Sequence, residues 1–344
     1  MMQGQVGIIG IGLLGKALSD CLACAGFEMY GYDIAQTESG AVHLLPSASA
    51  VFEQCDTVLL SLPNSNVAAS VINDVIDVIA ARHCILDTTT GDPEQIEALG
   101  VRLAKKGASY LEANVAGSSV QMRERKAVLL LGGEADVVAA QEPLFSTLVK
   151  KRFHVGRVGA GSRFKLVHNL ILGLNRAALA EGLNLAEALA FEAKRALEIL
   201  KQTPASSGVM ETKGLKMATR NYEPPQARLA QHHKDVRLIL ELAAKLETKT
   251  PLSAAHRELL ARAEALGFDS AWIADVQLSM KDCFSALTLC AVNTSKILLG
   301  TGVTNPITRH PTTIANAFTA LKELSDDRAV IGIGTGWTAV YSVG

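Results

Sequence analysis

The stretch VGIIGIGLLGKAL, residues 6–18, decides how the first part of the chain folds. Its apolar beginning predicts a buried strand over residues 5–10, which leads into a turn with the glycine pattern G-x-G-x-x-G. A helix is predicted next, over residues 13–25. The glycine spacing alone is a weak signal, but between a strand and a helix it is typical of a phosphate-binding turn.

The three glycines have different roles in such a turn. Gly10 allows the chain to turn tightly. Gly12 has no side chain, so a pyrophosphate can reach the backbone amides at the N-terminus of the helix. Gly15 lets the helix press against the sheet.

The next predicted strand, residues 28–33, completes the pattern because it ends on Asp33. This carboxylate can accept hydrogen bonds from both ribose hydroxyls, and the whole arrangement is specific for a dinucleotide-binding (Rossmann) fold. The charge of Asp33 would repel a 2′-phosphate, and the following Ile34 offers no positive charge to hold one. We therefore expect NAD as the cofactor, with NADP as the alternative.

The remaining sequence divides the chain into three sections. Strand and helix patterns alternate up to about residue 158, which predicts a parallel sheet covered on both faces. Residues 160–265 have helical periodicity and no strand signal. Strand signals return in SAWIAD, KILLGTGV and RAVIGIGTG, with helical stretches between them, at residues 270–275, 296–303 and 328–336.

The composition is that of a soluble protein with no affinity for polyanions. Lys and Arg number 33 and Asp and Glu number 34, so the sequence predicts neither a nucleic-acid-binding surface nor a membrane-binding patch. No apolar run approaches the length of a membrane span, so we expect a cytoplasmic protein. Cys21 and Cys24 form an isolated C-x-x-C in the first helix, which we interpret as packing; no metal site is expected.

Several motifs, in order, resemble the 3-hydroxyisobutyrate dehydrogenase (β-hydroxyacid dehydrogenase) family, which includes 6-phosphogluconate dehydrogenase. The resemblance covers residues 5 to about 262 and rests on GIIGIGLLGKAL, LSLPNSNV, DTTTGDP, EANVAGSS, GAGSRFKLVHN and HKD, at residues 7–18, 60–67, 87–93, 112–119, 159–169 and 233–235. It implies NAD(P)-dependent hydride transfer between nicotinamide and a small 3-hydroxy acid or its semialdehyde. The cofactor-binding residues that it implies are Gly10, Ile11, Gly12, Leu13, Leu14, Gly15, Asp33, Leu62, Pro63, Thr90 and Lys234. For Lys234 the alternative is a surface charge paired with Asp235.

Lys165 and Asn169 are the predicted catalytic residues. They are four residues apart on one predicted helix, so they share a face. Oxidation of an alcohol needs a base for the hydroxyl proton, and a desolvated lysine beside a positive nicotinium ring can act as one. Asn169 would orient the substrate. The family match falls on these positions.

The chain departs from the family where the substrate carboxylate is expected. The family's Ser-Gly-Gly is Ala116-Gly117-Ser118 here, so the serine hydroxyl is missing from its usual position. We expect the backbone amides of these three residues to bind substrate, with Ser118 or Ser119 replacing the hydroxyl.

The last part of the chain, from about residue 261, resembles the luciferase-like monooxygenases, and most closely the deazaflavin-dependent methylenetetrahydromethanopterin reductases. The match covers less than half of that family's (β/α)₈ barrel. The expected architecture is thus a Rossmann domain over 1–158, an all-α domain for substrate binding and dimerisation over 159–262, and a partial (β/α) barrel segment over 263–344.

Three functional hypotheses follow. The first is a hydroxyacid dehydrogenase with a non-catalytic tail. The second is a bifunctional enzyme with flavin or deazaflavin chemistry, and the third is a tail that serves only as an interaction module. Because the helical domain lacks the family's last helices, apolar surface along residues 170–200 should be uncovered, so we expect a homodimer or a higher oligomer.

Overall fold

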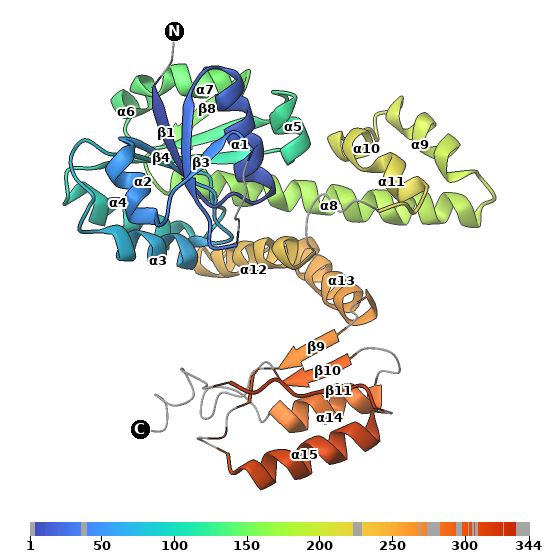
Figure 1. Cartoon of the computed structure of the whole chain (residues 1–344). Coiled ribbons are helices and arrows are strands. Elements are labelled where there is room, and N and C mark those ends of the chain that lie inside the picture. The colour runs from blue at the N-terminus through green and yellow to red at the C-terminus, as the bar shows by residue number, and fades with distance from the viewer. Residues whose placement is uncertain are drawn as a thin grey trace. The chain divides into compact units, whose positions relative to one another are not determined.

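The computed structural model describes residues 4–35, 40–222, 229–267, 270–273, 283–293, 298–301, 303, 304, 306, 309–325 and 327–334 (Figure 1). The chain separates into two compact units, Met1–Leu260 and Ala261–Gly344, and each is described by itself.

The first unit is built on an eight-stranded sheet with the strand order β3-β2-β1-β4-β5-β6-β7-β8. From β3 to β6 all neighbouring strands are parallel, as the sequence predicts. The strands are β1 (Gln5–Ile9), β2 (Glu28–Tyr32), β3 (Val42–Leu44), β4 (Thr57–Leu60), β5 (Cys84–Asp87), β6 (Ser109–Ala116), β7 (Val128–Gly132) and β8 (Lys151–Gly156). The order 3-2-1-4-5-6 is that of a doubly wound dinucleotide-binding sheet.

One part of the sheet departs from the prediction of an all-parallel sheet: β7 runs antiparallel to β6. The chain between these strands contains only the five-residue helix α5 (Ser119–Arg123), and a parallel connection needs a crossover of a dozen or more residues. The strand β8 then pairs with β7 in parallel.

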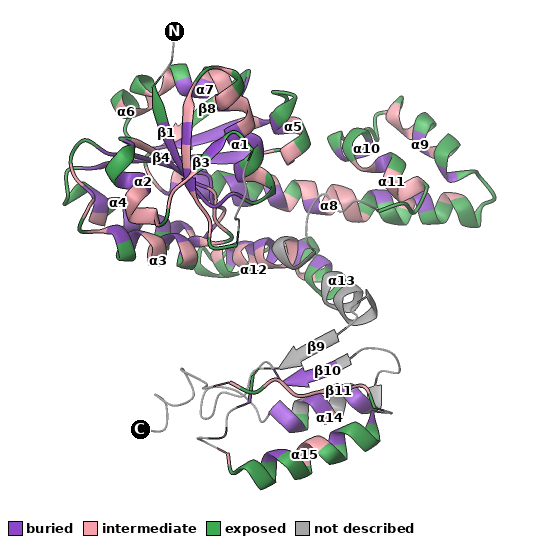
Figure 2. Ribbon diagram, viewed as in Figure 1, coloured by how far each residue is buried: buried purple, intermediate pink, exposed green. Residues whose placement is uncertain are grey.

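Helices cover both faces of this sheet (Figures 1 and 2). On one face, α1 (Leu13–Cys24), α5 and α7 (Glu142–Leu148) pack into a buried apolar cluster with the strands. On the other face, α2 (Ala48–Gln54), α3 (Ser65–Val75) and α4 (Pro93–Ala104) form a second cluster. A short helix, α6 (Ala135–Ala140), precedes α7.

The helix starts differ in a way that bears on function. Ser47, Asn64 and Asp92 cap α2, α3 and α4 with side-chain oxygens that accept hydrogen bonds from first-turn amides. The N-caps of α1 and α8 are glycines, Gly12 and Gly159, which have no such oxygen. The first-turn amides of these two helices must therefore find partners elsewhere.

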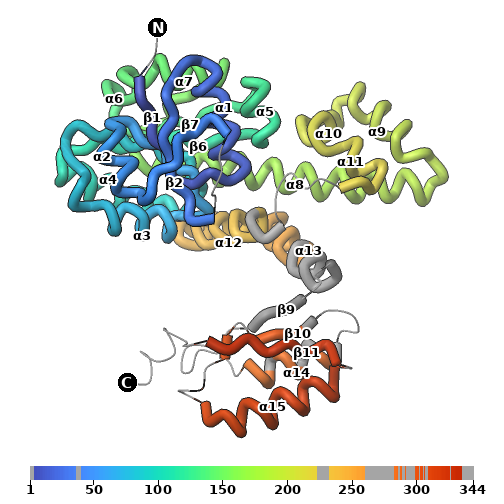
Figure 3. Tube along the Cα trace, viewed as in Figure 1, coloured from blue at the N-terminus to red at the C-terminus, as the bar shows by residue number. Residues whose placement is uncertain are grey.

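The second half of the unit is helical and is dominated by the 29-residue helix α8 (Ala160–Ala188) (Figure 3). The chain enters α8 directly after β8. The later helices are α9 (Ala193–Lys201), α10 (Gly208–Thr212), α11 (Gly214–Ala218), α12 (Leu229–Lys245) and α13 (Pro251–Gly267). One apolar cluster holds α9 and α10 against the C-terminal half of α8. The helix α12 packs on α8 as well.

The second unit has a three-stranded parallel sheet in the order β11-β10-β9. Its elements are β9 (Ser270–Ile273), α14 (Cys283–Asn293), β10 (Leu298–Thr301), α15 (Pro311–Leu324) and β11 (Ala329–Val330). Strands and helices alternate as predicted, and a closed barrel is not part of the described residues.

Among the helices described, none combines the length and the hydropathy that a bilayer crossing requires.

Candidate active site

The candidate site lies at the carboxyl ends of β1, β4 and β5. Because β1 and β4 are neighbours whose connections leave in opposite directions, their ends open a crevice where ligands bind in such sheets. Backbone hydrogen bonds extend the strand pairing into the loops, since Ser61 N donates to Ile9 O and Thr88 N donates to Leu60 O, each at 2.9 Å.

The glycine turn has the geometry that a dinucleotide requires. Gly10 has a φ of 93°, and a Cβ atom there would collide with the carbonyl oxygen of Ser61. A Cβ atom on Gly15 would collide with the carbonyl oxygen of Gly10. At Gly12 a Cβ atom would meet nothing within 4 Å, so the space in front of the α1 amides is open. This opening and the uncapped helix start fit a pyrophosphate.

The carboxylate of Asp33 is held beside this turn. Its Oδ2 accepts a hydrogen bond from Ile11 N at 2.7 Å, and its Oδ1 accepts one from Ala35 N at 2.8 Å. Each oxygen can accept a further hydrogen bond. The structure thus brings Asp33 together with the glycine turn, while Ile34 is 92% exposed and offers no charge.

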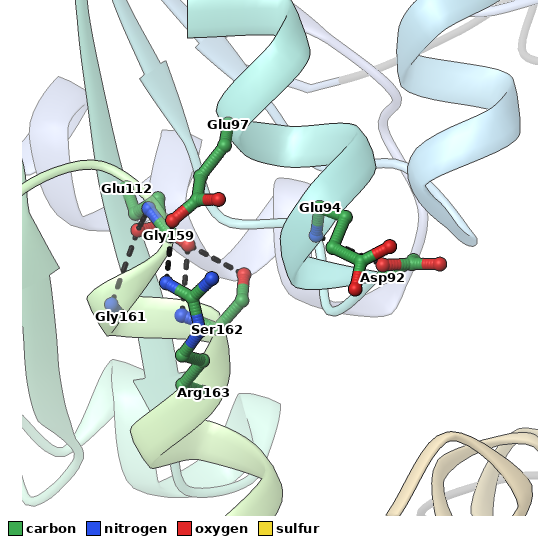
Figure 4. Close-up of polar contacts among 8 residues, drawn as sticks. All are labelled: Asp92, Glu94, Glu97, Glu112, Gly159, Gly161, Ser162 and Arg163. Carbon is green, nitrogen blue, oxygen red and sulfur yellow. Dashed lines mark hydrogen bonds and ion pairs between the residues drawn. The ribbon is translucent and has the colours of Figure 1, made fainter. Parts of the chain in front are cut away.

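Glu112 on β6 supplies the cap that α8 lacks (Figure 4). Its Oε2 accepts hydrogen bonds from Gly159 N at 2.6 Å and Gly161 N at 3.1 Å. Its Oε1 accepts from Ser162 N at 2.8 Å and from the Ser162 hydroxyl at 2.5 Å. Burial raises the pKa of Glu112, and these four hydrogen bonds act in the opposite direction. One buried carboxylate therefore fixes the start of α8.

Lys165 lies one turn further along α8, and only 7% of its surface is exposed. Its Nζ donates a hydrogen bond to Val115 O at 2.7 Å, on the same strand as Glu112. Burial lowers the pKa of Lys165 from 10.5 to about 8, and the charge of Asp235 opposes this shift. A lysine in this state can gain or lose a proton near neutral pH.

Asn169, on the same face of α8, is also buried. Its Nδ2 donates to Asp235 Oδ2 at 2.9 Å, which leaves its carbonyl oxygen and one amide hydrogen for other partners. Burial raises the pKa of Asp235, and the neighbouring Lys234 lowers it.

Lys234 is paired with Asp235, as the alternative interpretation has it, but its side chain is only 16% exposed and does not lie on the open surface. Its Nζ donates to Thr90 O at 2.6 Å and to Pro63 O at 3.3 Å, and lies 3.3 Å from Asp235 Oδ1. It thereby joins the loops after β4 and β5 to α12. Leu62 lies in the same region, and its N donates to Thr89 Oγ1 at 3.3 Å.

In the segment Ala116-Gly117-Ser118, the backbone amide of Ser118 already makes a hydrogen bond within the protein. Ser118 caps α5 in a capping box, in which Gln121 N donates to Ser118 Oγ at 3.2 Å and Ser118 N donates to Gln121 Oε1 at 2.9 Å. The expectation of three available amides therefore needs correction, because the Ser118 amide is engaged. The Ser118 hydroxyl proton is free to donate to a ligand.

Sequence reasoning missed the role of Glu112 and treated Asp235 only as a partner of Lys234. A signal for Glu112 exists, because a glycine-rich helix start without Ser, Thr, Asn or Asp at its N-cap needs an acceptor from elsewhere.

Two pockets of the first unit lie elsewhere on its surface. Two surface pockets of about 520 and 530 Å³ lie by the start of β1 and by the end of α1, away from the carboxyl ends of the strands. The second includes Cys21 and Cys24, which are unpaired thiols. In the part of the chain that the structure describes, no group of three or more His, Cys, Asp or Glu side chains could hold a metal ion.

Family models match the chain in three places. Residues 5–156 match the NAD binding domain of 6-phosphogluconate dehydrogenase, and residues 159–278 match the NAD-binding model of NADP-dependent 3-hydroxyisobutyrate dehydrogenase. Residues 236–343 match the luciferase-like monooxygenase model. This match begins earlier than the predicted residue 261 and overlaps the preceding one over residues 236–278.

Curated relatives cover the same part of the chain. Glyoxylate/succinic semialdehyde reductase 1 of Arabidopsis thaliana is 28% identical over 271 residues, which are 76% of this chain and 93% of the relative. 2-(Hydroxymethyl)glutarate dehydrogenase of Eubacterium barkeri is 27% identical over 271 residues, or 76% of this chain and 90% of the relative.

Solved structures support the fold. A 3-hydroxyisobutyrate dehydrogenase of Mycobacterium tuberculosis, solved with L-serine, superposes with a TM-score of 0.68 at 24% identity and covers 77% of this chain and 94% of its own.

Proposed function

Because the chain belongs, over residues 5–278, to the 3-hydroxyisobutyrate dehydrogenase family of NAD(P)-dependent oxidoreductases, we propose that it interconverts a small 3-hydroxy acid and its semialdehyde with Lys165 as the acid–base group. The observation that carries the proposal is the buried Lys165 amine, with its pKa near about 8, on one helix face with Asn169. On α12, Asp235 contacts Asn169 and the adjacent Lys234 contacts the loops that follow β4 and β5.

Each residue has a defined task in this reaction. A nicotinamide cofactor, with its pyrophosphate at the glycine turn, would supply or take up the hydride. In oxidation Lys165 Nζ removes the hydroxyl proton, and in reduction it returns that proton to the carbonyl oxygen. The carboxamide of Asn169, oriented by Asp235, hydrogen-bonds the substrate. The Gly117 amide and the Ser118 hydroxyl bind the substrate carboxylate near Ala116.

The acid–base role predicts opposite pH dependences for the two directions. Oxidation needs the neutral amine, so its kcat/KM should rise as the pH increases through about 8, the pKa of Lys165. Reduction needs the ammonium form, so its kcat/KM should fall over the same range. Initial rates in both directions across this pH range test the assignment, and parallel profiles would contradict it.

Cofactor choice depends on Asp33 in our proposal. Replacing Asp33 with serine should remove the charge that repels a 2′-phosphate and shift the kcat/KM ratio towards NADP by about tenfold or more. The measurement is kcat/KM for both cofactors with the wild type and with Asp33→Ser. A wild type that already prefers NADP would show that the interpretation of Asp33 is wrong.

A second copy of the chain is the proposed partner of α8. Phe164, Val167 and Ile171 are each about half exposed on one side of this helix, and Leu185 continues the stripe. We expect at least a dimer, and Ile171→Glu should dissociate it by placing a charge in a dry interface. Sedimentation at micromolar concentration distinguishes a dimer from a monomer. A monomeric wild type would refute the proposed dimer.

The luciferase-like match supports a second candidate function, a bifunctional enzyme. We propose instead that the segment 263–344 does not bind flavin tightly, because the three parallel strands among its described residues leave open edges where a barrel would close. The domains of residues 1–158 and 159–262 then form the dehydrogenase. Titration of the full chain with FMN and with deazaflavin should show no submicromolar binding. Submicromolar binding of either cofactor would favour a bifunctional enzyme over a tail that serves only as an interaction module.

We further propose a cytoplasmic location, because the described cysteines are all unpaired thiols, as is usual in a reducing compartment.

A further inference from the structure

The catalytic face of α8 continues past Asn169 to a half-buried arginine. Arg176 follows Asn169 by seven residues, which is two helical turns, so it lies on the same face about 10 Å further along the helix axis. Its guanidinium is charged at every relevant pH and presents a planar fork of donors. None of the residues that the structure describes forms a hydrogen bond or an ion pair with it.

The surroundings of Arg176 are basic. His232 on α12, His256 on α13 and Lys213 before α11 all have pKa values lowered first by burial and then by the charge of Arg176. The pKa of His232 falls to about 3 and that of His256 is lowered as well, so neither ring carries a charge near neutral pH. The fixed charge of Arg176 is therefore flanked by two neutral imidazoles and by the amine of Lys213.

The two histidines close on α8 at Gly173, one turn before Arg176. A Cβ atom at Gly173 would lie 2.8 Å from His232 Cε1 and 2.9 Å from His256 Cε1, and the two rings are 5.1 Å apart. His232 Nε2 is buried and has no hydrogen-bond partner among the described residues. A buried polar nitrogen without a partner is costly and indicates a place for an absent group.

Asp235 is the acid whose charge acts on Arg176, but no hydrogen bond or ion pair joins them among the described residues. Burial lowers the pKa of Arg176 and the charge of Asp235 opposes this shift, so the two groups are within electrostatic reach. However, the oxygens of Asp235 already face Asn169 Nδ2 at 2.9 Å and Lys234 Nζ at 3.3 Å. A half-buried arginine that has no ion-pair partner in the protein is suited to bind the carboxylate of a ligand.

We propose that Arg176, with His232 and Lys213 beside it, binds a second carboxylate of the substrate, at the end opposite to the reacting carbon. This inference rests on the proposed function and specifies its substrate class as 3-hydroxy acids with a dicarboxylic skeleton, or the matching semialdehydes. The guanidinium of Arg176 matches a carboxylate in charge and in its planar, two-pronged geometry.

The test compares substrates with and without a distal carboxylate. The probes are 2-(hydroxymethyl)butanedioate and 2-(hydroxymethyl)pentanedioate against 3-hydroxy-2-methylpropanoate. Wild type should have a kcat/KM about 10–100-fold higher for one of the dicarboxylates, the range for a hydrogen-bonded charge pair, mainly through KM. In Arg176→Met this ratio should fall to about one, whereas the exposed Arg195→Met on α9 should keep it.

The outcomes separate the two proposals. Oxidation of the monocarboxylate with a wild-type ratio near one would overturn the subsite and leave the dehydrogenase intact. If no hydroxy acid is oxidised, calorimetric titration of the full chain with glutarate and butyrate decides the subsite. Binding of glutarate that Arg176→Met abolishes supports it, and equal or absent binding of both acids refutes it. Preference for a phosphate ester over the dicarboxylate would also overturn the assignment.

Discussion

Replacing Lys165 with alanine should lower kcat by about 10²–10⁴, the usual contribution of general acid–base catalysis. The amine is buried, its pKa is lowered to about 8, and it is held by Val115 O near the carboxyl end of β6. Binding of NADH should persist, because the glycine turn and Asp33 do not contact Lys165. Steady-state turnover and NADH titration of the same preparations measure the two effects separately.

Two further variants make this test specific. Lys165→Arg keeps a positive charge but cannot lose its proton, so it should be nearly as slow as the alanine variant. Lys194→Ala removes an exposed lysine on α9 and should leave turnover unchanged. Wild-type turnover in Lys165→Ala would remove Lys165 from the mechanism.

Glu112→Gln should reduce both stability and turnover. The amide of glutamine would place a donor against the donors Gly159 N, Gly161 N and Ser162 N, so at least one of them loses its partner. We expect a loss of about 2–4 kcal/mol in the free energy of unfolding, and a melting temperature lower by about 5–15 °C. Since α8 carries Lys165, a shifted helix start should lower kcat by about 10–100-fold.

The matched control is Glu97→Gln, because Glu97 is a carboxylate on α4 that also contacts the first turn of α8 (Figure 4). Glu97 pairs with Arg163 at 2.5 Å, but both side chains are substantially exposed, so its loss should cost little. The residual activity of Glu112→Gln should keep its pH midpoint at about 8, the pKa of Lys165. The reason is that Glu112 fixes the position of Lys165 and does not itself exchange a proton with the substrate. Equal melting temperatures and turnover for the two variants would refute the positioning role.

Local sequence was enough to predict the dinucleotide-binding half of the fold. Gly10 and Gly15 lie where other backbone atoms leave no room for a side chain. This requirement produces the glycine spacing that can be recognised in the sequence. The spacing of Lys165 and Asn169 likewise indicates a shared helix face, because residues four apart lie on one side of a helix. The family match of residues 5–278 confirms the predicted enzyme class.

Contacts between distant segments could not be predicted in this way. The strand β7 runs antiparallel to β6 because the connection through α5 is short. The amide of Ser118 is occupied because it donates to the side chain of Gln121. Glu112 reaches α8 across about fifty residues of sequence, and nothing in its own neighbourhood indicates that contact. Arg176 is visible in the sequence, but its lack of an anion appears only when α12 and α13 are in place.

The most direct test of the account is the initial rate of reduced nicotinamide formation with a panel of 3-hydroxy acids, assayed with NAD and with NADP. The account predicts that at least one acid is oxidised, faster with NAD, at a rate that rises through pH about 8 and is lost in Lys165→Ala. The contradicting result is no turnover of any 3-hydroxy acid or semialdehyde with either cofactor, or turnover that survives the loss of Lys165.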